Sequence, residues 1–380
     1  MEVCKAVGGE IVSADSVQIY RRLDVGANKP SAEDLAAVRH HLVNILDPGS
    51  EEYTVGQWLR AAYAAIDDVL QRGKVPLVVG GTMLYTQWLV QGQPDAPEGD
   101  AATQQIVRTI LAPFEATGDW DGGLELLRAV NATRAAQLNK NDWVRLGRSL
   151  QISMDMRQGD EVFTGERTGA ASERYDVRSY FIVADRAEAA RRITQRCQAM
   201  LSSGLLQEVA ALLHAGLLPK ESSPGRAIGY RQMREYLLRP DPHAGDAEAL
   251  VQFYSDFCTA TRRYASDQLK WFRSSKGTEF VWCARDFADP NSVPSIARAI
   301  AEDLSLDEHC HQAKRMDATQ LQLREDNLAQ AKQMRLFIQP DLRKTMSAGA
   351  FAQLQRQADQ CTALAQGIPH LPQQEVNSLS

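Results

Sequence analysis

The stretch GGEIVSADSVQIY, residues 8–20, decides the fold. Glu10–Ser13 is a short apolar, β-prone run after two glycines, a pattern typical of a buried strand. Asp15, Ser16 and Gln18 follow at its C-terminal end, which is the end where ligands bind in an open α/β sheet. These side chains can grip a nucleobase or accept a proton, and equally they can form a turn that caps the next element. Both interpretations are open at this point.

Length, charge and cysteine content limit the kinds of protein that this chain can be. The chain has 380 residues, enough for two domains and a tail. Its net charge of -6 gives no global attraction for nucleic acid, so any RNA contact must use local basic patches. Six dispersed cysteines without a CxxC pair argue against a zinc site or a disulfide scaffold and for a reducing compartment. No run of about 18 apolar residues is present, so a soluble, intracellular protein is expected.

Strand and helix patterns alternate around the opening stretch. Met1–Ala6 reads as the end of a helix stopped by glycine, so we expect a strand, a loop and part of that helix upstream; a short first helix is the alternative. Thr54–Arg72 is an amphipathic helix, and Lys74–Val79 is a second buried strand that leads into the helix Met83–Val90. This alternation predicts a parallel sheet.

The same patterns predict four segments. Residues 1–93 form the first part of an α/β core, and residues 94–174 form an all-helical insertion. Residues 175–305 return to the core with strands near 180–183 and 280–282 and with basic helices. Residues 306–380 form a Gln-rich tail that is helical in part, as over 319–337, and disordered at its end.

Two features suit phosphate groups. Gly80-Gly81-Thr82 lies between a strand and a helix, where glycines let a phosphate approach the backbone and the helix N-terminus favours an anion. Arg192 and Arg196 are four residues apart on one predicted helix and can hold a diphosphate together. The alternatives are a purely structural turn and a solvated helix face. Lys29, before Pro30, is either a phosphate contact or a turn lysine.

Basic and aromatic residues also occur together, the pattern expected for RNA backbones and stacked bases. Taken singly, each is better explained as a surface charge or a core aromatic. His40 and His41 have no partner at metal-ligand spacing, and we predict a structural role for them and no protein metal cluster. The candidate RNA-binding residues are Arg145, Arg148, Arg226, Gly229, Tyr230, Arg231, Lys270, Trp271 and Arg273.

Several motifs, in this order, resemble one family, that of the tRNA dimethylallyltransferases (tRNA isopentenyltransferases). The resemblance covers roughly Glu2 to Glu302. Motifs that recur together in the right order are more specific than any one of them. They are IVSADSVQIYRRLDVGANKP, HHLVNILDP, PLVVGGTMLY, NKNDWVRLGRSLQI, RRITQRCQAMLSSGLLQEV, RAIGYRQM and TRRYASDQLKWFR.

The resemblance implies a P-loop nucleotide-kinase-like parallel sheet with an inserted helical domain. It implies transfer of a dimethylallyl group from its diphosphate to the exocyclic amine of a flipped-out adenosine beside the anticodon. Asp15 matches the general base, while Thr82 and Arg196 match groups that bind the leaving diphosphate. The other residues expected at the substrates are Ser16, Gln18 and Tyr20 beside the adenine, and Lys29, Gly80, Gly81 and Arg192 near the diphosphate. The segments 144–148, 226–231 and 266–273 match parts that contact tRNA.

Two departures from the family pattern matter. The family's P-loop, GxTxxGK[ST], holds the diphosphate and Mg²⁺, and it does not occur in these 380 residues. Because losing one such donor typically costs about 10²–10³ in rate, a form without the loop is expected to be nearly inactive. Ser266-Asp267 stands where the family often has a basic pair, which lowers the expected tRNA affinity.

Three functions remain open from the sequence. The first is a tRNA dimethylallyltransferase that uses tRNA, dimethylallyl diphosphate and Mg²⁺. The second is a tRNA-binding pseudoenzyme without the diphosphate loop. The third is an adenylate isopentenyltransferase, against which the helical insertion and the motifs RAIGYRQM and QLKWFR argue, because a free nucleotide needs neither. We expect a monomer in the cytoplasm, or in an organelle if a targeting segment precedes Met1.

Overall fold

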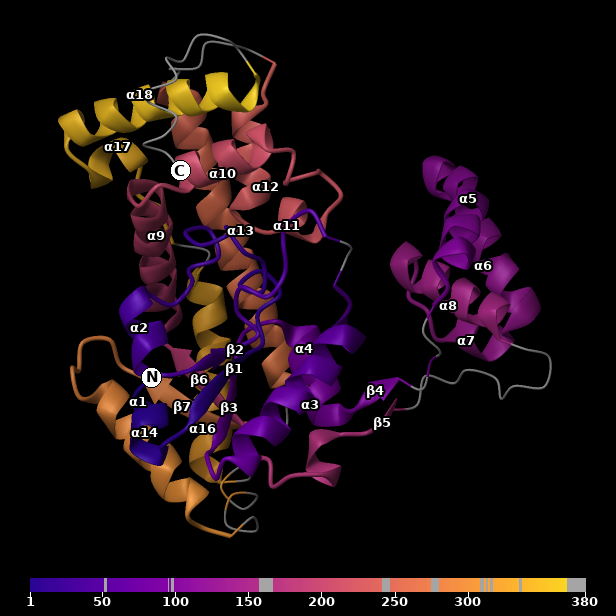
Figure 1. Cartoon of the computed structure of the whole chain (residues 1–380), viewed down its shortest axis with the longest axis horizontal. Helices are drawn as coiled ribbons and strands as arrows, with labels where there is room; N and C mark the ends of the chain where they lie inside the picture. Colours follow the sequence, from indigo (N-terminus) through magenta and orange to yellow (C-terminus); the bar gives the residue numbers. More distant parts are fainter. Residues whose placement is uncertain are drawn as a thin grey trace. The chain divides into compact units, whose positions relative to one another are not determined.

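The computed structural model describes residues 1–50, 53–94, 96, 99–156, 167–240, 247–274, 280–307, 311, 314, 317–334 and 337–367. The chain forms two compact units (Figure 1). The smaller unit is Trp88–Tyr175, and the larger unit combines Met1–Gln87 with the chain from Asp176 onward. The smaller unit contains the stretch in which only helices were expected. In the part of the chain that is described, no helix is long and apolar enough to cross a membrane.

The first sheet of the larger unit is parallel, as predicted. Its order is β2-β1-β3, with β1 at Glu10–Ser13, β2 at His40–His41 and β3 at Pro76–Val79. All four residues of β1 are buried, which matches its apolar sequence and its central position. A second parallel pair joins β6 (Tyr180–Ala184) to β7 (Val281–Arg285). Both sheets therefore have the strand direction that crossover helices impose.

Helices make up most of the larger unit. α1 ends at Gly8, whose positive φ of 63° is the left-handed cap predicted for glycine there. α3 begins after Thr54, whose hydroxyl accepts the Gln57 N–H in a capping box. The bounds are α1 Glu2–Val7, α2 Ala32–Ala37, α3 Val55–Gln71, α4 Met83–Gln91, α9 Arg186–Ser202, α10 Leu205–His214, α11 Ser223–Arg226, α12 Tyr230–Leu237, α13 Ala247–Arg273, α14 Ser292–Leu304, α16 Ala318–Gln333, α17 Leu342–Thr345 and α18 Ala348–Ala365.

A buried carboxylate anchors the start of β1. Glu10 is 2% exposed, and its carboxylate receives Arg72, Lys74 at 2.8 Å and the His41 Nε2 at 2.8 Å. The hydrogen bonds from Arg72 are the largest of several effects that lower the pKa of Glu10, against the effect of its burial. His41 thus has the structural role predicted for it. This cluster fixes β1 to the end of α3 and to β2.

The smaller unit is a helical cluster on a two-stranded ribbon. Its core packs α5 (Ala101–Thr117), α6 (Trp120–Val130), α7 (Ala132–Ala136) and α8 (Trp143–Asp155) around buried Leu, Val and Trp side chains. Trp120 and Trp143 meet edge to face at 5.1 Å. An antiparallel ribbon of β4 (Gln93–Pro94) and β5 (Arg167–Thr168) was not predicted, because two-residue strands leave no period in the sequence. The 3₁₀ turn Ala171–Glu173 follows it.

The C-terminal segment does not behave as a separate tail. α18 packs against α10 and buries Phe351, Leu354 and Ala358. The expected helix over 319–337 is present as α16, which ends at Gln333. Residues 335 and 336 lie outside the described part, and Phe337 is not helical. The predicted disordered end, residues 368–380, also lies outside it.

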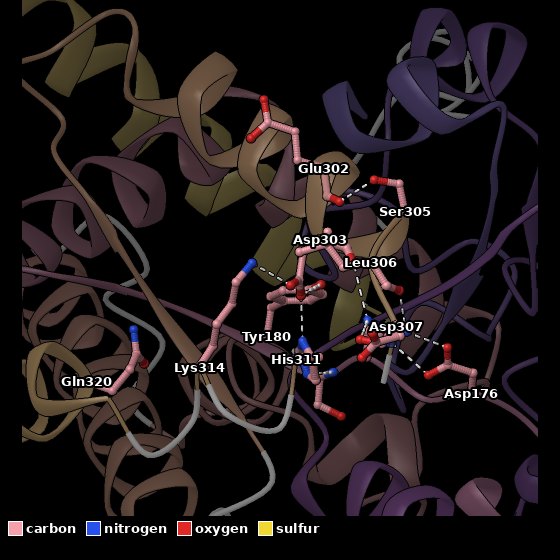
Figure 2. Close-up of polar contacts among 12 residues, drawn as sticks. Asp176, Tyr180, Glu302, Asp303, Ser305, Leu306, Asp307, His311, Lys314 and Gln320 are labelled. Carbon is pink, nitrogen blue, oxygen red and sulfur yellow. Dashed lines mark hydrogen bonds and ion pairs between the residues drawn. The ribbon is translucent and has the colours of Figure 1, made fainter. Parts of the chain in front are cut away.

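A buried polar cluster holds the chain after α14 (Figure 2). Asp303 accepts hydrogen bonds from the Tyr180 hydroxyl, the His311 Nδ1 and the Lys314 Nζ, each at 2.5 Å. Asp303 and His311 are each 1% exposed. Burial alone would raise the pKa of Asp303, but these hydrogen bonds outweigh it and lower the pKa to about 2. The His311 Nε2 accepts the Ser179 N–H, so both ring nitrogens are engaged and the cluster is structural.

Candidate active site

Asp15 lies in the turn directly after β1. Its Oδ1 accepts the backbone N–H groups of Val17 at 2.8 Å and Gln18 at 3.1 Å. Its Oδ2 makes no hydrogen bond within the described residues, and the side chain is half-buried. The turn-cap interpretation is therefore observed for Asp15, and its role at a substrate stays a prediction. One oxygen caps the turn and orients the carboxylate, which leaves the other oxygen available to accept a proton.

The Gly80-Gly81-Thr82 turn lies beside Asp15, because β3 pairs with β1 in parallel register. The Thr82 N–H donates to the Ala14 carbonyl at 3.2 Å, and the Thr82 hydroxyl accepts the Ser16 N–H at 3.1 Å. Gly80 approaches so closely that an added Cβ would lie 2.2 Å from the Ala14 oxygen. The structure thus brings together three of the predicted residues, Asp15, Ser16 and Thr82, at the carboxyl edge of one sheet.

Two further residues reach this turn from α13, which passes beside it (Figure 1). The Tyr264 hydroxyl donates to the Gly81 carbonyl at 2.9 Å, and the Gln268 Nε2 donates to the same oxygen at 2.7 Å. Sequence analysis did not assign them to the site. The available signal was their i,i+4 spacing inside the TRRYASDQ motif, which puts both on one helix face.

Two stacked aromatic rings, those of Trp58 and Tyr85, pack at the end of β1 next to the Asp15 turn. The Trp58 Nε1 donates to the Ser13 carbonyl at 3.1 Å, and the Trp58 ring stacks on Tyr85 with centroids 4.4 Å apart. Trp58 is fully buried. Burial is the main cause that raises the pKa of the Tyr85 phenol, with smaller contributions from Tyr20, Tyr53 and Asp15. The aromatic pair therefore forms a rigid, apolar contact at the end of β1, where the Asp15 turn begins.

Three residues predicted near the substrates point inward. The Gln18 amide donates to the carbonyls of Ala27 and Asn28, at 3.3 and 3.2 Å, and Tyr20 is 2% exposed. The Lys29 ammonium donates to Tyr20 O, Asp24 Oδ1 and Asn44 Oδ1, which engages its three protons, and its side chain is 5% exposed. The phosphate contact predicted for Lys29 is therefore corrected to the turn role. Gln18 and Tyr20 support the loop in this structure.

Comparison with known proteins identifies the chain. A family model described as IPP transferase matches residues 18–275, more than half of the sequence. The chain belongs to the IPP transferase family.

Individual relatives agree with this assignment. tRNA dimethylallyltransferase 1 of Citrifermentans bemidjiense is 39% identical over 311 residues, which are 80% of this chain and 92% of that protein. tRNA dimethylallyltransferase 9 of Arabidopsis thaliana is 36% identical over 304 residues, or 72% of this chain, which spans only 65% of that protein. The full-length tRNA isopentenylpyrophosphate transferase of Bacillus halodurans superposes with a TM-score of 0.53 at 27% identity, over 80% of this chain and 90% of that one. The predicted fold class is thereby confirmed.

Arg192 and Arg196, which were predicted to bind the diphosphate, both lie on α9. Arg192 donates to Glu188 at 3.0 Å and lies over the Phe287 ring, 4.6 Å from its centroid. Arg196 is exposed and makes no hydrogen bond or ion pair within the described residues. No hydrogen bond links either arginine to Asp15 or Thr82 in that part of the chain. Arg196 is therefore the cation that remains available for an anionic ligand.

The predicted RNA-binding segment around α12 is only partly exposed. Arg226 and Arg231 are exposed. Tyr230 is fully buried, and its hydroxyl donates to Glu208 Oε1 at 2.6 Å. Gly229 is also buried, with a positive φ of 91°. The prediction that Tyr230 and Gly229 contact RNA is corrected: they shape the turn that presents the two arginines.

The predicted RNA-binding residues at the end of α13 are also only partly exposed. Lys270 is exposed and paired with Asp267 at 2.9 Å, so part of its charge is neutralised locally. Trp271 is half-buried against Phe272, and Arg273 Nη1 is buried with no hydrogen-bond partner among the described residues. Lys270 is therefore the most accessible of the three predicted residues.

In the smaller unit, α8 carries the two remaining candidates. Arg145 is exposed and bonded to Asp142 at 2.7 Å, while Arg148 is half-buried and donates to Gln151 at 2.9 Å. Burial lowers the pKa of Arg148. Val144, beside them, is 84% exposed, an unusual position for an apolar side chain. Val144 and Arg145 thus present an apolar and a cationic group together.

Proposed function

We propose that this protein transfers a dimethylallyl group from dimethylallyl diphosphate to the exocyclic N6 amine of the adenosine adjacent to the anticodon in tRNA. Family membership supports the reaction class. The observation that carries the proposal for this chain is the juxtaposition of Asp15 and the Thr82 turn. A carboxylate with one unengaged oxygen lies beside a glycine-rich turn with a hydroxyl, so a base and an anion-binding element share one edge of the sheet.

The reaction follows from these groups. The N6 nitrogen attacks the allylic carbon, the carbon–oxygen bond breaks, and its electron pair leaves with the diphosphate. An aromatic amine is a weak nucleophile whose protons become acidic as the new bond forms. Asp15 Oδ2 accepts one of these protons as general base, while the two backbone N–H groups hold Oδ1 in place.

The leaving diphosphate needs cationic and hydrogen-bonding partners, because negative charge builds on it in the transition state. The Thr82 hydroxyl and the exposed Arg196 are the groups of this chain that we assign to it. Mg²⁺ prefers oxygen ligands and usually binds through one or two carboxylates together with substrate phosphates. The hydroxyls of Ser16 and Thr82 are oxygen donors of that chemistry, and the ion would supply positive charge to the diphosphate. Within the described residues, no three acidic, His or Cys side chains form a metal cluster.

A second candidate function is a tRNA-binding protein without transferase activity. It differs from the first in whether a GxTxxGK[ST] segment belongs to the protein, and the 380 residues contain none. Free adenylate as acceptor is disfavoured, because the helical unit Trp88–Tyr175 presents Val144 and Arg145 to solvent, which a free nucleotide does not require.

The test compares two forms of the protein for tRNA binding and for transfer from radiolabelled dimethylallyl diphosphate. One form is the 380-residue chain, and the other carries a GxTxxGK[ST] segment encoded upstream in the gene. We expect both forms to bind tRNA and the longer form to prenylate the adenosine beside the anticodon. A gene without such a segment, together with tRNA binding and no transfer, would establish the binding protein instead. Transfer to free adenylate rather than tRNA would overturn both.

A further inference from the structure

One backbone carbonyl in the site receives two side-chain donors from a distant helix. The Gly81 oxygen accepts the Tyr264 hydroxyl and the Gln268 amide, at 2.9 and 2.7 Å. A carbonyl oxygen has two lone pairs, so both acceptor positions are filled. Tyr264 and Gln268 are four residues apart on α13 and therefore act from the same face of one rigid element. In the sequence, Tyr264 lies 183 residues after Gly81 and Gln268 lies 187 residues after it.

The two donors fix the peptide group that leads into Thr82. On its other side, Thr82 is held by the sheet, since its N–H donates to Ala14 O and its hydroxyl accepts from Ser16 N. Glycine by itself would let this peptide plane rotate freely. An added Cβ at Gly81 would lie 2.3 Å from the Gln268 Nε2, so a side chain there would displace the Gln268 amide from the carbonyl. The flexible residue is thus restrained by α13 rather than by its own side chain.

Tyr264 remains a hydrogen-bond donor at neutral pH. Burial and the nearby charge of Asp15 raise the pKa of its phenol, and hydrogen bonds with Gln268 and Thr82 offset only part of the rise. The phenol lies beside the Gly81–Thr82 peptide, because its hydroxyl donates to Gly81 O at 2.9 Å. Tyr264 therefore reaches, through the Gly81 carbonyl, the turn whose Thr82 the reaction assigns to the diphosphate.

We propose that Tyr264 and Gln268 are positioning residues that lock the Gly81–Thr82 peptide and so aim the Thr82 hydroxyl at a diphosphate. The inference rests on the proposed function, because it takes the diphosphate as the ligand of this turn. Gln268 lies within the segment 266–273 that is expected to contact tRNA. The inference leaves the RNA contacts to Lys270, Trp271 and Arg273 and assigns Tyr264 and Gln268 to the diphosphate site. A loss of these donors should weaken diphosphate binding without weakening RNA binding.

The test measures the affinity for inorganic pyrophosphate by calorimetry and the affinity for tRNA by fluorescence, with the full chain. The variants are Tyr264→Phe, Gln268→Met and the double variant, which remove the donors but keep most of the side-chain volume. Tyr254→Phe is the matched control: it lies on the same helix and loses a hydroxyl-to-carbonyl hydrogen bond, that to Thr194 O at 3.2 Å, away from Gly81. Thr82→Val is made alone and with Tyr264→Phe to measure their coupling.

We expect pyrophosphate to bind about fivefold more weakly to each single variant and at least about tenfold more weakly to the double variant. Affinity for tRNA should stay within about twofold, as should pyrophosphate binding by Tyr254→Phe. In the Thr82→Val background, Tyr264→Phe should add less than about twofold, because its effect passes through Thr82.

Two results would overturn the proposal in distinguishable ways. If the unmodified protein binds pyrophosphate and the double variant binds it equally well, the positioning role is wrong and the proposed function stands. If the unmodified protein binds no pyrophosphate in either the 380-residue or the longer form, the proposed function fails together with this inference. Equal losses of pyrophosphate and tRNA affinity would show that the two residues only support the fold.

Discussion

At the scale of single residues, Asp15 has a structural role in the turn and also the chemical role that we propose for it. Its Oδ1 accepts hydrogen bonds from two N–H groups of the turn, and these bonds orient the carboxylate. A helix or turn cap of this kind is worth about 1 kcal/mol. The same side chain offers Oδ2 to the reaction. The two roles are separable by substitution, because an amide oxygen can replace Oδ1 as acceptor but cannot take up a proton.

Asp15→Asn is therefore expected to lower kcat by at least about 10²-fold in the P-loop-containing form, while the Kd for tRNA changes little. Steady-state kinetics and tRNA titration check this. Asp15→Ala is the comparison: it should lose the same activity and also lower Tm, because the cap is lost. A large loss of tRNA affinity with unchanged kcat in Asp15→Asn would show that Asp15 binds the base instead.

At the scale of elements, the site depends on how closely β3 follows β1. The register brings Val79 opposite Ser13, so the two turns leave the sheet side by side. Gly80 is the closest point, since its Cα faces the Ala14 backbone rather than a movable side chain. A side chain at this position would force the two turns apart and separate Thr82 from Ser16.

Gly80→Ala is accordingly expected to reduce pyrophosphate binding at least about tenfold and to destabilise the fold by roughly 1–3 kcal/mol. Calorimetry and urea unfolding measure the two effects. Gly349→Ala is the control, because an added Cβ there meets nothing within 4 Å and lies in the first turn of α18. It should leave binding unchanged and stability unchanged or slightly higher. Full pyrophosphate affinity in Gly80→Ala would contradict the close approach.

At the scale of the whole molecule, the larger unit is closed by segments far apart in the sequence. Asp303, His311 and Lys314 join the chain after α14 to Tyr180 on β6 (Figure 2). Asp176 and Arg178 form an ion pair near them, and Arg178 also donates to the carbonyls at the end of α14. α18 then covers α10. The C-terminal segment is thus part of the fold that holds the site.

The stability contributed by Asp303 should depend on pH. The folded-state pKa of about 2 lies below the unfolded value of about 3.9, so the contribution is complete above the unfolded value and is lost as pH falls toward 2. Asp303→Asn is expected to lower the free energy of unfolding at pH 7 by roughly 3 kcal/mol. Its difference from the unmodified protein should shrink as the pH is lowered from 4 to about 2.

Urea unfolding at several pH values measures this. Asp121→Asn is the control, since Asp121 is exposed and makes no hydrogen bond within the described residues. Its effect should stay within about 0.5 kcal/mol at every pH. A difference between Asp303→Asn and the unmodified protein that is constant with pH would exclude the carboxylate of Asp303 as the titrating group.

The sequence alone determined the strands of the two parallel sheets, the order of those elements and the two turns that carry Asp15 and Thr82. These depend on neighbouring residues: apolar runs make buried strands, glycines end helices, and parallel crossovers bring successive strand ends to the same edge. For the same reason the motifs could be recognised in order, and the family assignment followed.

Only the tertiary structure decided which side chains face the site. Tyr264 and Gln268 meet Gly81 across more than 180 positions, and Tyr230 and Lys29 turn inward to Glu208 and to the loop before β2. The type of a basic or aromatic residue does not show whether it lies in the core or on the surface. Its partner is set by how distant helices pack, and this packing depends on contacts that no local pattern of the sequence encodes.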